Sequence, residues 1–479
     1  MARRPTLPLV HSLELSRPLA PLRALAGLPH PFMLHSALPD ARTDGPRRAR
    51  WTFFGADPFA VFRGGDHAAA IETWRQVAAR APHSHGQQAP GVPFTGGAVG
   101  YWAYDYARRL ETVPSLAADD LGLPDFVMAL YDVVGAYDHD MRQTWLFSTG
   151  LPLEGAAAMV RAEERLAQMR ARILGVGRAP LVVERSAEPL KVHGTFDEAG
   201  WRQAVLRVQD HIRRGDIYQA NLSQRWRVER AGALSLAPAL YESLMQVSPA
   251  PFAAYLGLDD HALLSASPER FLELRGDRVE TRPIKGTRPR GATPEEDAAL
   301  AAELEASAKD RAENVMIVDV LRNDLGRVCE RGTIEAPALC ELERFPQVMH
   351  LTSTVTGRLR ADLDAFDLLH ACFPGGSITG APKLRAMEIL EAIEPVRRHA
   401  YTGALGWVGW DGDADWSIII RTATATASGL VFHAGGGITA DSDPDAEYRE
   451  TLDKAEGVRA ALAAVLGEVR LGDGVRSGA

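Results

Sequence analysis

The feature that most restricts the fold is a series of strand-like segments in the second half of the chain. They read "FPQVMHLTSTVTGRL", "YTGALGWVGW", "DWSIIIRTATATASG" and "GLVFHAGGG". Short turns separate the last three, and strands joined by short turns pair antiparallel, whereas parallel strands need long crossovers. The pattern therefore predicts antiparallel sheet with helices packed against it, which is an α+β fold.

Two long segments have helical patterns. Residues 154–174 are rich in Ala, Glu and Arg at helical spacing. Residues 293–326 predict a second helix that begins with Thr293 as N-cap and Glu296 as the third residue of a capping box. We expect Gly326 to end it.

The first 175 residues alternate short apolar runs with Pro and Gly. Within "PDFVMALYDVVGAYDHDMRQTWLFS", two alternating segments joined by "DHD" predict a hairpin. The pattern breaks over residues 175–196, so we expect an N-terminal region at 1–178 and a larger catalytic region at 190–468.

The overall charge excludes one class of function. The net charge of −9 is unlike that of a nucleic-acid-binding protein, so an anionic ligand needs a local basic pocket. The sequence shows neither a signal-peptide apolar core nor an apolar run long enough to span a membrane, and we expect a cytoplasmic protein. The three cysteines lack metal-ligand spacing and are expected to be buried thiols.

Lysine is rare in this chain, with five lysines against 48 arginines. One of them, Lys285, lies in the arginine-rich stretch "TRPIKGTRPRG". A lysine, unlike an arginine, can lose its proton when it is desolvated and then act as a nucleophile. Chance placement of a lysine is the alternative interpretation.

An acidic residue stands sixteen positions before this lysine, Glu269 in "SASPERF". The intervening sequence predicts a strand, a turn and a strand, so a hairpin would bring Glu269 and Lys285 together. The pair would be either a catalytic acid with a nucleophile or an ordinary salt bridge.

Two acidic pairs have i,i+3 spacing on expected helices: Asp310 with Glu313, and Glu447 with Glu450. That spacing puts both carboxylates on one helix face. Two such pairs facing one site would suit Mg²⁺, although exposed acidic pairs without function are common.

Two glycine-rich stretches, "GGSITGAPK" and "HAGGGITADS", imitate nucleotide motifs without their required spacing. We expect each to be a turn leading into a helix, whose free N–H groups could hold a carboxylate. Ordinary turns are the alternative.

These segments, together with "IYQANLSQR", "DRAENVMIVDVLRNDLGRV", "YTGALGWVG" and "IIIRTATA", resemble the chorismate-utilising enzymes. That family includes anthranilate, aminodeoxychorismate, isochorismate and salicylate synthases. The resemblance covers residues 200–460 and, more weakly, "PFMLHSALPD" in the first half. It implies a composite α/β sandwich with two antiparallel sheets face to face and helices outside.

The resemblance also implies the reaction. The residue between "PI" and "GT" is typically Ala in anthranilate synthases and Lys in aminodeoxychorismate synthases, and this chain has Lys285. The expected enzyme is a transferase that makes 4-amino-4-deoxychorismate for p-aminobenzoate and folate. Lys285 would add to C2 of chorismate with Glu269 as general acid, its pKa lowered by burial near Arg288 or Arg290.

Further roles follow from the same likeness. His350 would position the reacting ring, and Mg²⁺ would be held by Glu313, Glu447 and Glu450. The expected substrate-binding residues are Thr379, Gly380, Tyr401, Arg421, Gly435, Gly436, Gly437 and Lys454. An effector pocket like the tryptophan site of anthranilate synthases would involve Leu34, Ser36, Pro251 and Phe252, unless these residues only pack the two halves together.

Ammonia should come from a separate glutamine amidotransferase subunit, because none of the three cysteines lies in a glycine-rich nucleophile elbow. The rival interpretations are anthranilate synthase component I, a pyridoxal-phosphate enzyme that uses Lys285, and a non-catalytic effector-binding relative. Antiparallel sheet and the missing phosphate cup disfavour the second. The retained acids at 269, 313 and 450 disfavour the third.

Overall fold

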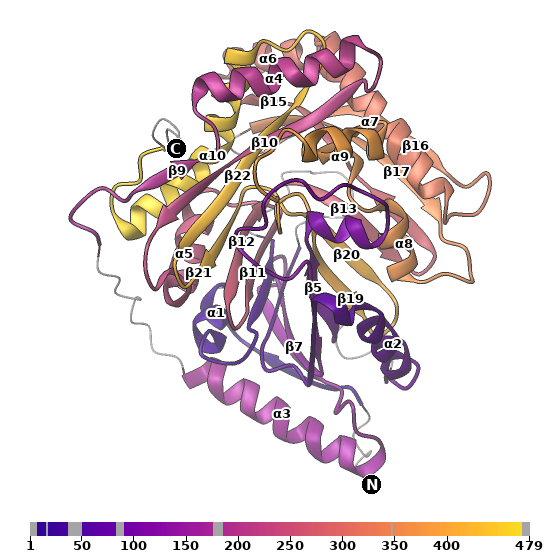
Figure 1. Ribbon diagram of the computed structural model, residues 1–479. Coiled ribbons are helices and arrows are strands. Elements are labelled where there is room, and N and C mark those ends of the chain that lie inside the picture. The colour runs from indigo at the N-terminus through magenta and orange to yellow at the C-terminus, as the bar shows by residue number, and fades with distance from the viewer. Residues whose placement is uncertain are drawn as a thin grey trace.

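The computed structural model describes residues 7–15, 18–36, 50–82, 91–175, 185–345 and 348–471. Two antiparallel sheets form its centre and helices surround them (Figure 1). A layer of apolar side chains drawn from both sheets, including Phe53, Tyr101 and Trp407, packs between them. The expected α+β sandwich is therefore confirmed.

The first sheet has twelve strands in the described part of the chain. In order across the sheet they are β1 (Leu9–Leu13), β8 (Gln143–Ser148), β7 (Val133–Asp138), β3 (Trp51–Gly55), β2 (Phe32–His35), β11 (Phe252–Gly257), β12 (His261–Ser267), β21 (Thr422–Thr426), β22 (Gly429–Ile438), β10 (Gln219–Glu229) and β18 (Gly380–Ala381), with β9 (Val192–Gly194) paired to β10.

The second sheet has ten strands by the same count over the described ranges. Their order is β15 (Ile284–Pro289), β17 (Val348–Arg358), β14 (Arg278–Thr281), β13 (Arg270–Arg275), β20 (Ala414–Ile418), β19 (Ala404–Gly409), β5 (Gly97–Trp102), β6 (Phe126–Tyr131) and β4 (Ala60–Arg63), with β16 (Glu335–Arg344) paired to β17.

Helices flank both sheets. Those that contact the first sheet are α1 (Ala20–Leu25), α3 (Gly155–Gly175), α4 (Glu198–Arg213), α5 (Ala233–Val247), α9 (Lys383–Glu391) and α10 (Pro444–Leu466). Those that pack on the second are α2 (His67–Ala78), α6 (Pro294–Ala306), α7 (Ala308–Gly326) and α8 (Ala365–Cys372). Three short 3₁₀ turns complete the described elements: η1 (Gly64–Asp66), η2 (Tyr104–Arg109) and η3 (Gly376–Ile378).

Both sheets draw strands from both sides of the expected division between 1–178 and 190–468. Strand β2 pairs with β11 in the first sheet, and β5 pairs with β19 in the second. Residues 176–184, within the expected boundary, lie outside the described residues. The division between the two regions is therefore visible only in the sequence, because each sheet contains strands from both regions.

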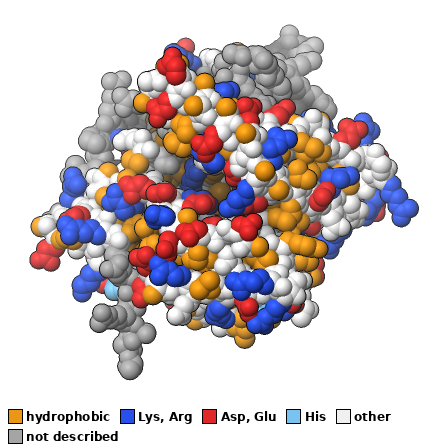
Figure 2. Space-filling view, turned by 90° about the horizontal axis from the view of Figure 1, so that it is seen from above, with side chains coloured by type: hydrophobic (Ala, Val, Ile, Leu, Met, Phe, Trp, Pro, Cys, Tyr) orange, Lys and Arg blue, Asp and Glu red, His pale blue; other side chains and the backbone are white. Residues whose placement is uncertain are grey.

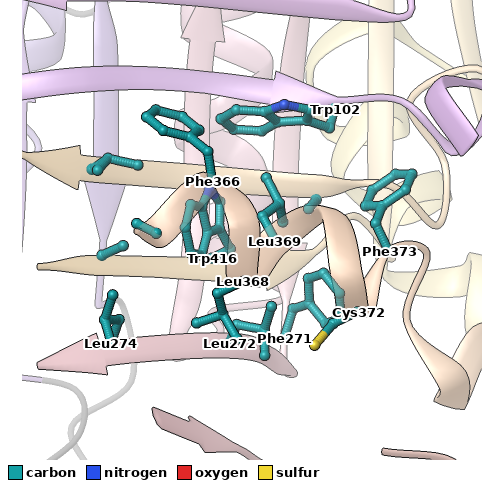
Figure 3. Close-up of a cluster of buried hydrophobic side chains, with 14 of the residues drawn as sticks. Trp102, Phe271, Leu272, Leu274, Phe366, Leu368, Leu369, Cys372, Phe373 and Trp416 are labelled. Carbon is teal, nitrogen blue, oxygen red and sulfur yellow. The ribbon is translucent and has the colours of Figure 1, made fainter. Parts of the chain in front are cut away.

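The core beneath α8 shows why the second sheet is well anchored. Side chains of α8, including Phe366, Leu368 and Leu369, pack onto Leu272 of β13 and Trp416 of β20 (Figure 3). All five are essentially inaccessible to solvent. Strand β13, which follows Glu269 directly, is therefore held in a close-packed interior.

The long helix expected over 293–326 is interrupted. Thr293 does cap its start and accepts a hydrogen bond from the Glu296 N–H at 3.2 Å, and the helical segment ends at Gly326. Ser307, however, leaves the helical conformation and caps a second helix, accepting from the Asp310 N–H at 3.2 Å. A serine that can satisfy orphan N–H groups permits such a break.

The carboxylate of Glu296 also departs from the expected capping box. It accepts from the Ala292 N–H at 2.8 Å, one residue before the N-cap. The cap of α6 is therefore only half of the predicted reciprocal pair.

Two other expected strand segments divide between the sheets. The "DHD" hairpin forms as β7 and β8, but Asp132 separates β7 from β6, which belongs to the second sheet. Similarly, "DWSIIIRTATATASG" becomes β20 in one sheet and β21 in the other. Residue Arg421, between them, has a φ of 51°, so the chain turns sharply there.

Cys329, Cys340 and Cys372 are buried and unpaired, as predicted. In the described portions of the chain, the helices are all too short or too polar to cross a membrane.

Candidate active site

Glu269 and Lys285 lie at the two ends of one hairpin. Glu269 immediately precedes β13, β13 pairs with β14, and Lys285 is the second residue of β15. Each charged group affects the pKa of the other, as expected for neighbours. The hairpin thus brings the two residues together as the sequence indicates.

Glu269 is a buried acid with only 6% of its surface exposed. Its Oε1 accepts a hydrogen bond from the Ser377 hydroxyl at 2.6 Å, and the backbone N–H of Ile284 also donates to the carboxylate. Burial nevertheless raises the pKa of Glu269 to about 7. The carboxyl is therefore substantially protonated at neutral pH and able to donate a proton.

Lys285 is half-buried on β15, opposite Leu351 of β17. Burial lowers the pKa of its amine, Glu313 opposes that effect, and Lys454 adds to it. The cation that helps to lower the pKa of Lys285 is therefore Lys454, and not the expected Arg288 or Arg290. Arg288 pairs with acids of α6 and α7, and Arg290 pairs with an acid of α6, so both charges are already neutralised.

The expected glycine turn at 435–437 is instead part of strand β22, paired with β10. The turn was predicted because three glycines in a row are typical of turns, and that prediction was wrong. Here they clear space: a Cβ on Gly436 would lie 2.9 Å from Glu447 Oε2, and one on Gly437 would lie 3.6 Å from Lys285 Nζ and 2.2 Å from Gln219 Nε2. The strand lets these side chains approach its backbone.

The two acidic pairs lie on α7 and α10, and Glu313 of α7 interacts electrostatically with Glu450 of α10. Glu447 is 5% exposed and accepts from Ser442 Oγ at 2.7 Å. Lys454 Nζ lies 2.6 Å from Glu450 Oε1 and donates to the Gly435 carbonyl at 2.9 Å.

Charge at this cluster is balanced mainly by lysines. Burial raises the pKa of Glu313 and of Glu447. Burial alone would raise that of Glu450 too, but the ion pair with Lys454 lowers it on balance. Over the described ranges, no set of three or more His, Cys, Asp and Glu is placed to hold a metal ion by itself. The donors are carboxylate oxygens, which suit Mg²⁺ when water and substrate complete the shell.

The segment "GGSITGAPK" does lead into a helix, α9, as predicted. Thr379 is fully buried, and its hydroxyl donates to the Gly375 carbonyl at 3.0 Å, so it shapes the segment from within. Gly380 is in β18, paired with Ala220.

Arg421 stands close to Glu269, and His350 stands close to Arg421. His350 bonds Thr287 Oγ1 at 2.8 Å, and burial, reinforced by Arg421, lowers its pKa to about 3, so the ring is neutral. The Arg421 guanidinium makes no hydrogen bond within the described part of the chain, and its charged neighbour is Glu269. It is available to an anionic group.

Tyr401 is a buried residue beside strand β22. Its ring stacks on His433 of β22 at 4.8 Å, and burial raises the pKa of its hydroxyl. Charged neighbours of Tyr401 are Arg398 and Glu394, not Glu269.

Three residues at the site were missed from the sequence. Ser377 contacts Glu269, Gln219 borders Lys285 with a buried Oε1 that has no partner in the described residues, and Lys309 faces the acids of α7 and α10. Ser377 and Gln219 belong to motifs quoted above and Lys309 directly precedes one, but serine, glutamine and an exposed lysine carry no spacing signal of their own. The face that carries α4 and α6 is hollowed near its centre, with charged side chains of both signs around the hollow (Figure 2).

Leu34, Ser36, Pro251 and Phe252, expected around an effector pocket, line one cavity of about 750 Å³. It lies between the sheets, and charged side chains such as Arg270, Glu280 and Asp415 line its other side.

The fold and the family model agree on the class of protein. A family described as chorismate binding enzyme matches residues 39–460. The match spans most of the chain, and the chain therefore belongs to the chorismate-binding enzymes, as the motifs indicate.

Two curated relatives with different named activities are similar to this chain. The chain is 45% identical to aminodeoxychorismate synthase component 1 of Klebsiella aerogenes, with 77% of each chain covered. It is 42% identical to anthranilate synthase component 1 of Thermus thermophilus, with 78% of each covered. The crystal structure of anthranilate synthase component I from Streptococcus pneumoniae matches with a TM-score of 0.75 at 29% identity, covering 87% of this chain and 94% of that one.

Proposed function

We propose that this enzyme is the chorismate-converting component of an aminodeoxychorismate synthase, which makes 4-amino-4-deoxychorismate from chorismate and ammonia for p-aminobenzoate and folate synthesis. Overall identity does not separate this activity from anthranilate synthesis, because relatives of both kinds are similarly close. The distinction rests on Lys285.

The observation that carries the proposal is a desolvated lysine beside a protonated acid. Burial lowers the pKa of Lys285 and raises that of Glu269 to about 7. The same desolvation favours a neutral amine, which is a nucleophile, and a neutral carboxyl, which is a proton donor. An ordinary salt bridge would instead hold both groups charged.

The first step forms a covalent bond. The nitrogen of Lys285 adds to C2 of chorismate, the ring double bonds shift and the C4–O bond breaks. Glu269 gives its proton to the departing hydroxyl, which leaves as water, and the added nitrogen releases one proton to solvent.

In the second step ammonia adds at C4, the double bonds shift back and the bond from C2 to Lys285 breaks. One proton passes from the incoming ammonia to the lysine nitrogen. Because Lys285 occupies C2 during the reaction, ammonia adds at C4 and the enolpyruvyl group is retained.

Other residues bind and orient the substrate. Neutral His350 faces the reacting ring, and Arg421, with Tyr401, receives the enolpyruvyl carboxylate. The backbone of Gly380 and of the strand 435–437 borders the ring, Thr379 shapes the adjoining turn, and Lys454 supplies positive charge.

Magnesium is part of the proposal. Glu313, Glu447 and Glu450 would hold Mg²⁺, which when bound neutralises the ring carboxylate of the substrate. Their fit rests on carboxylate chemistry and on the space that Gly436 leaves beside Glu447 and Glu450.

A covalent species provides the main test. Chorismate and Mg²⁺ without ammonia should give a protein heavier by one chorismate less one water, with the added mass on the peptide that contains Lys285. Added ammonium should remove it. Lys285→Arg keeps the charge but has no neutral amine, so it should form no adduct. Intact-protein and peptide mass spectrometry measure each outcome.

Two further variants sharpen this test. Lys285→Ala leaves C2 open and should slowly yield anthranilate-like or isochorismate-like products. Glu269→Gln should slow adduct formation by about 10²–10⁴-fold, the usual effect of losing a general acid. Native-rate aminodeoxychorismate synthesis by Lys285→Arg, with no adduct in either protein, would leave Lys285 only a charge in the binding site.

The source of ammonia gives a second prediction. The chain carries no glutaminase elbow, and we expect a separate amidotransferase subunit to hydrolyse glutamine. Ammonium salts should support turnover by the pure chain, and glutamine should do so only after that subunit is added. Glutamine-dependent product from the pure chain would contradict this.

Metal binding gives a third prediction. Isothermal calorimetry with Mg²⁺ in the presence of chorismate should show binding to the native enzyme and none to Glu313→Ala or Glu450→Ala, because a ligand on one helix cannot replace one on the other. Asp319→Ala, an exposed acid on α7, is the matched control. Full activity of either glutamate variant in chelator would refute the assignment.

We also propose that the cavity between the sheets binds a small effector of the tryptophan type. The support is that all four expected residues line it and that it is large enough for a small molecule.

Calorimetry tests the cavity directly. Tryptophan should release measurable heat with the native chain and less with Ser36→Ala, which loses a polar contact. No heat and no inhibition at millimolar tryptophan would leave these residues only a packing role.

A further inference from the structure

Ser377 is a buried polar residue that has no role in the reaction proposed above. It is 7% exposed and belongs to the 3₁₀ turn η3, more than a hundred positions from Glu269 in sequence. Its hydroxyl donates to Glu269 Oε1 at 2.6 Å. When the carboxyl is ionised, a charge-assisted bond of this length is among the strong hydrogen bonds of proteins.

Two glycines bring Ser377 into place. A Cβ on Gly375 would lie 2.8 Å from Ile418 Cδ1, and one on Gly376 would lie 2.8 Å from Val320 Cγ1. A larger residue at either position would require Ile418, Val320 or the segment itself to shift. The turn is thus wedged between the second sheet and α7, with Ser377 directed at the acid.

The turn is also fixed on its far side. Thr379 donates to the Gly375 carbonyl, closing the turn internally. Arg398, which is 2% exposed, donates to the Ile378 carbonyl at 3.1 Å and is held by Glu394 at 2.7 Å. The position of Ser377 is therefore set by a buried ion pair as well as by packing.

The backbone of Glu269 is equally restrained. Its carbonyl accepts from the Ile418 N–H at 3.1 Å, and Ser267 Oγ donates to the Ile418 carbonyl at 2.6 Å. Both partners of the Ser377–Glu269 bond are thus held by rigid elements, which is what a positioned proton donor requires.

The groups that face the carboxyl come from several elements. Lys285 lies on β15 and Arg421 in the link between β20 and β21, and the Ile284 N–H donates from β15. Among these and Ser377, the serine is the neutral side chain that donates to the carboxyl.

We propose that Ser377 is a positioning residue that holds Glu269 Oε1, so that the proton to be transferred sits on Oε2 and the carboxylate left after transfer is stabilised. The proton on Oε2 passes to the C4 hydroxyl, which leaves as water, and Ser377 then donates to the new anion. This role rests on the proposed function, in which Glu269 is the general acid.

Removing the donor should change the acidity of Glu269. Burial raises the pKa of this carboxyl and Ser377 lowers it, so Ser377→Ala should raise it further, by about one pH unit for a lost bond to a charged group. Since Glu269 must be protonated to act, the alkaline limb of the pH profile of kcat/KM should shift to higher pH. A weaker acid also releases its proton more slowly. The maximal kcat should therefore fall by about tenfold or more.

The experiment is an infrared pH titration of the Glu269 carboxyl band in the free enzyme, with Glu269→Gln subtracted, alongside kcat/KM profiles. Ser243→Ala is the matched control, because Ser243 is also 7% exposed and donates one bond, at 2.9 Å, to the Ala461 carbonyl. It should leave the band and the profile unchanged.

Ser377→Thr keeps the hydroxyl and should restore the native titration, and Ser377→Cys, a weaker donor, should lie between. Unshifted bands in Ser377→Ala or, if that variant does not fold, in Ser377→Cys would overturn the proposal. Failure of the native enzyme to form the Lys285 adduct would instead overturn the proposed function, since the titration uses no substrate.

Discussion

The proposed active site depends on burying an acid and an amine together. Glu269 and Lys285 are both desolvated where the β13–β14 hairpin meets β22. Shifting a buried carboxyl from its usual pKa to about 7 costs about 3 kcal/mol of folding free energy above pH 7, because the unfolded chain ionises more readily. That cost is offset by the packed cores around the sheets, and the same burial shifts both groups toward the neutral, reactive form.

Glycines make this burial geometrically feasible. Gly436 and Gly437 let Glu447, Gln219 and Lys285 approach the backbone of β22, while Gly375 and Gly376 let the turn carrying Ser377 settle against β20 and α7. The functional side chains stand at the meeting of elements distant in sequence, and small residues provide the room at each meeting. Such sites tolerate little substitution, since added atoms would displace backbone or a catalytic group.

Sharing of the sheets between the two halves gives the site its rigidity. Strand β5 of the first region lies between β19 and β6, and β2 extends the first sheet through β11. The cavity lined by Leu34 and Phe252 opens at this shared seam, and Arg270, the residue after Glu269, also lines it. Glu269 lies just before β13 and Arg270 is its first residue, so adjacent positions of the chain contribute to two different sites.

The sequence by itself indicated strand segments of the second half, the helix over residues 154–174, the cap at Thr293 and the hairpin between Glu269 and Lys285, because periodicity, caps and turns are local properties. Its motifs also indicated the acids of α7 and α10 and the family.

Only the tertiary structure decided the rest. Which cation lowers the pKa of Lys285, the strand form of Gly435–Gly437, the break at Ser307 and the contact of Ser377 with Glu269 all depend on neighbours far away in sequence. A pKa and a side-chain partner are set by desolvation and packing, which arise only when both sheets have closed around the site.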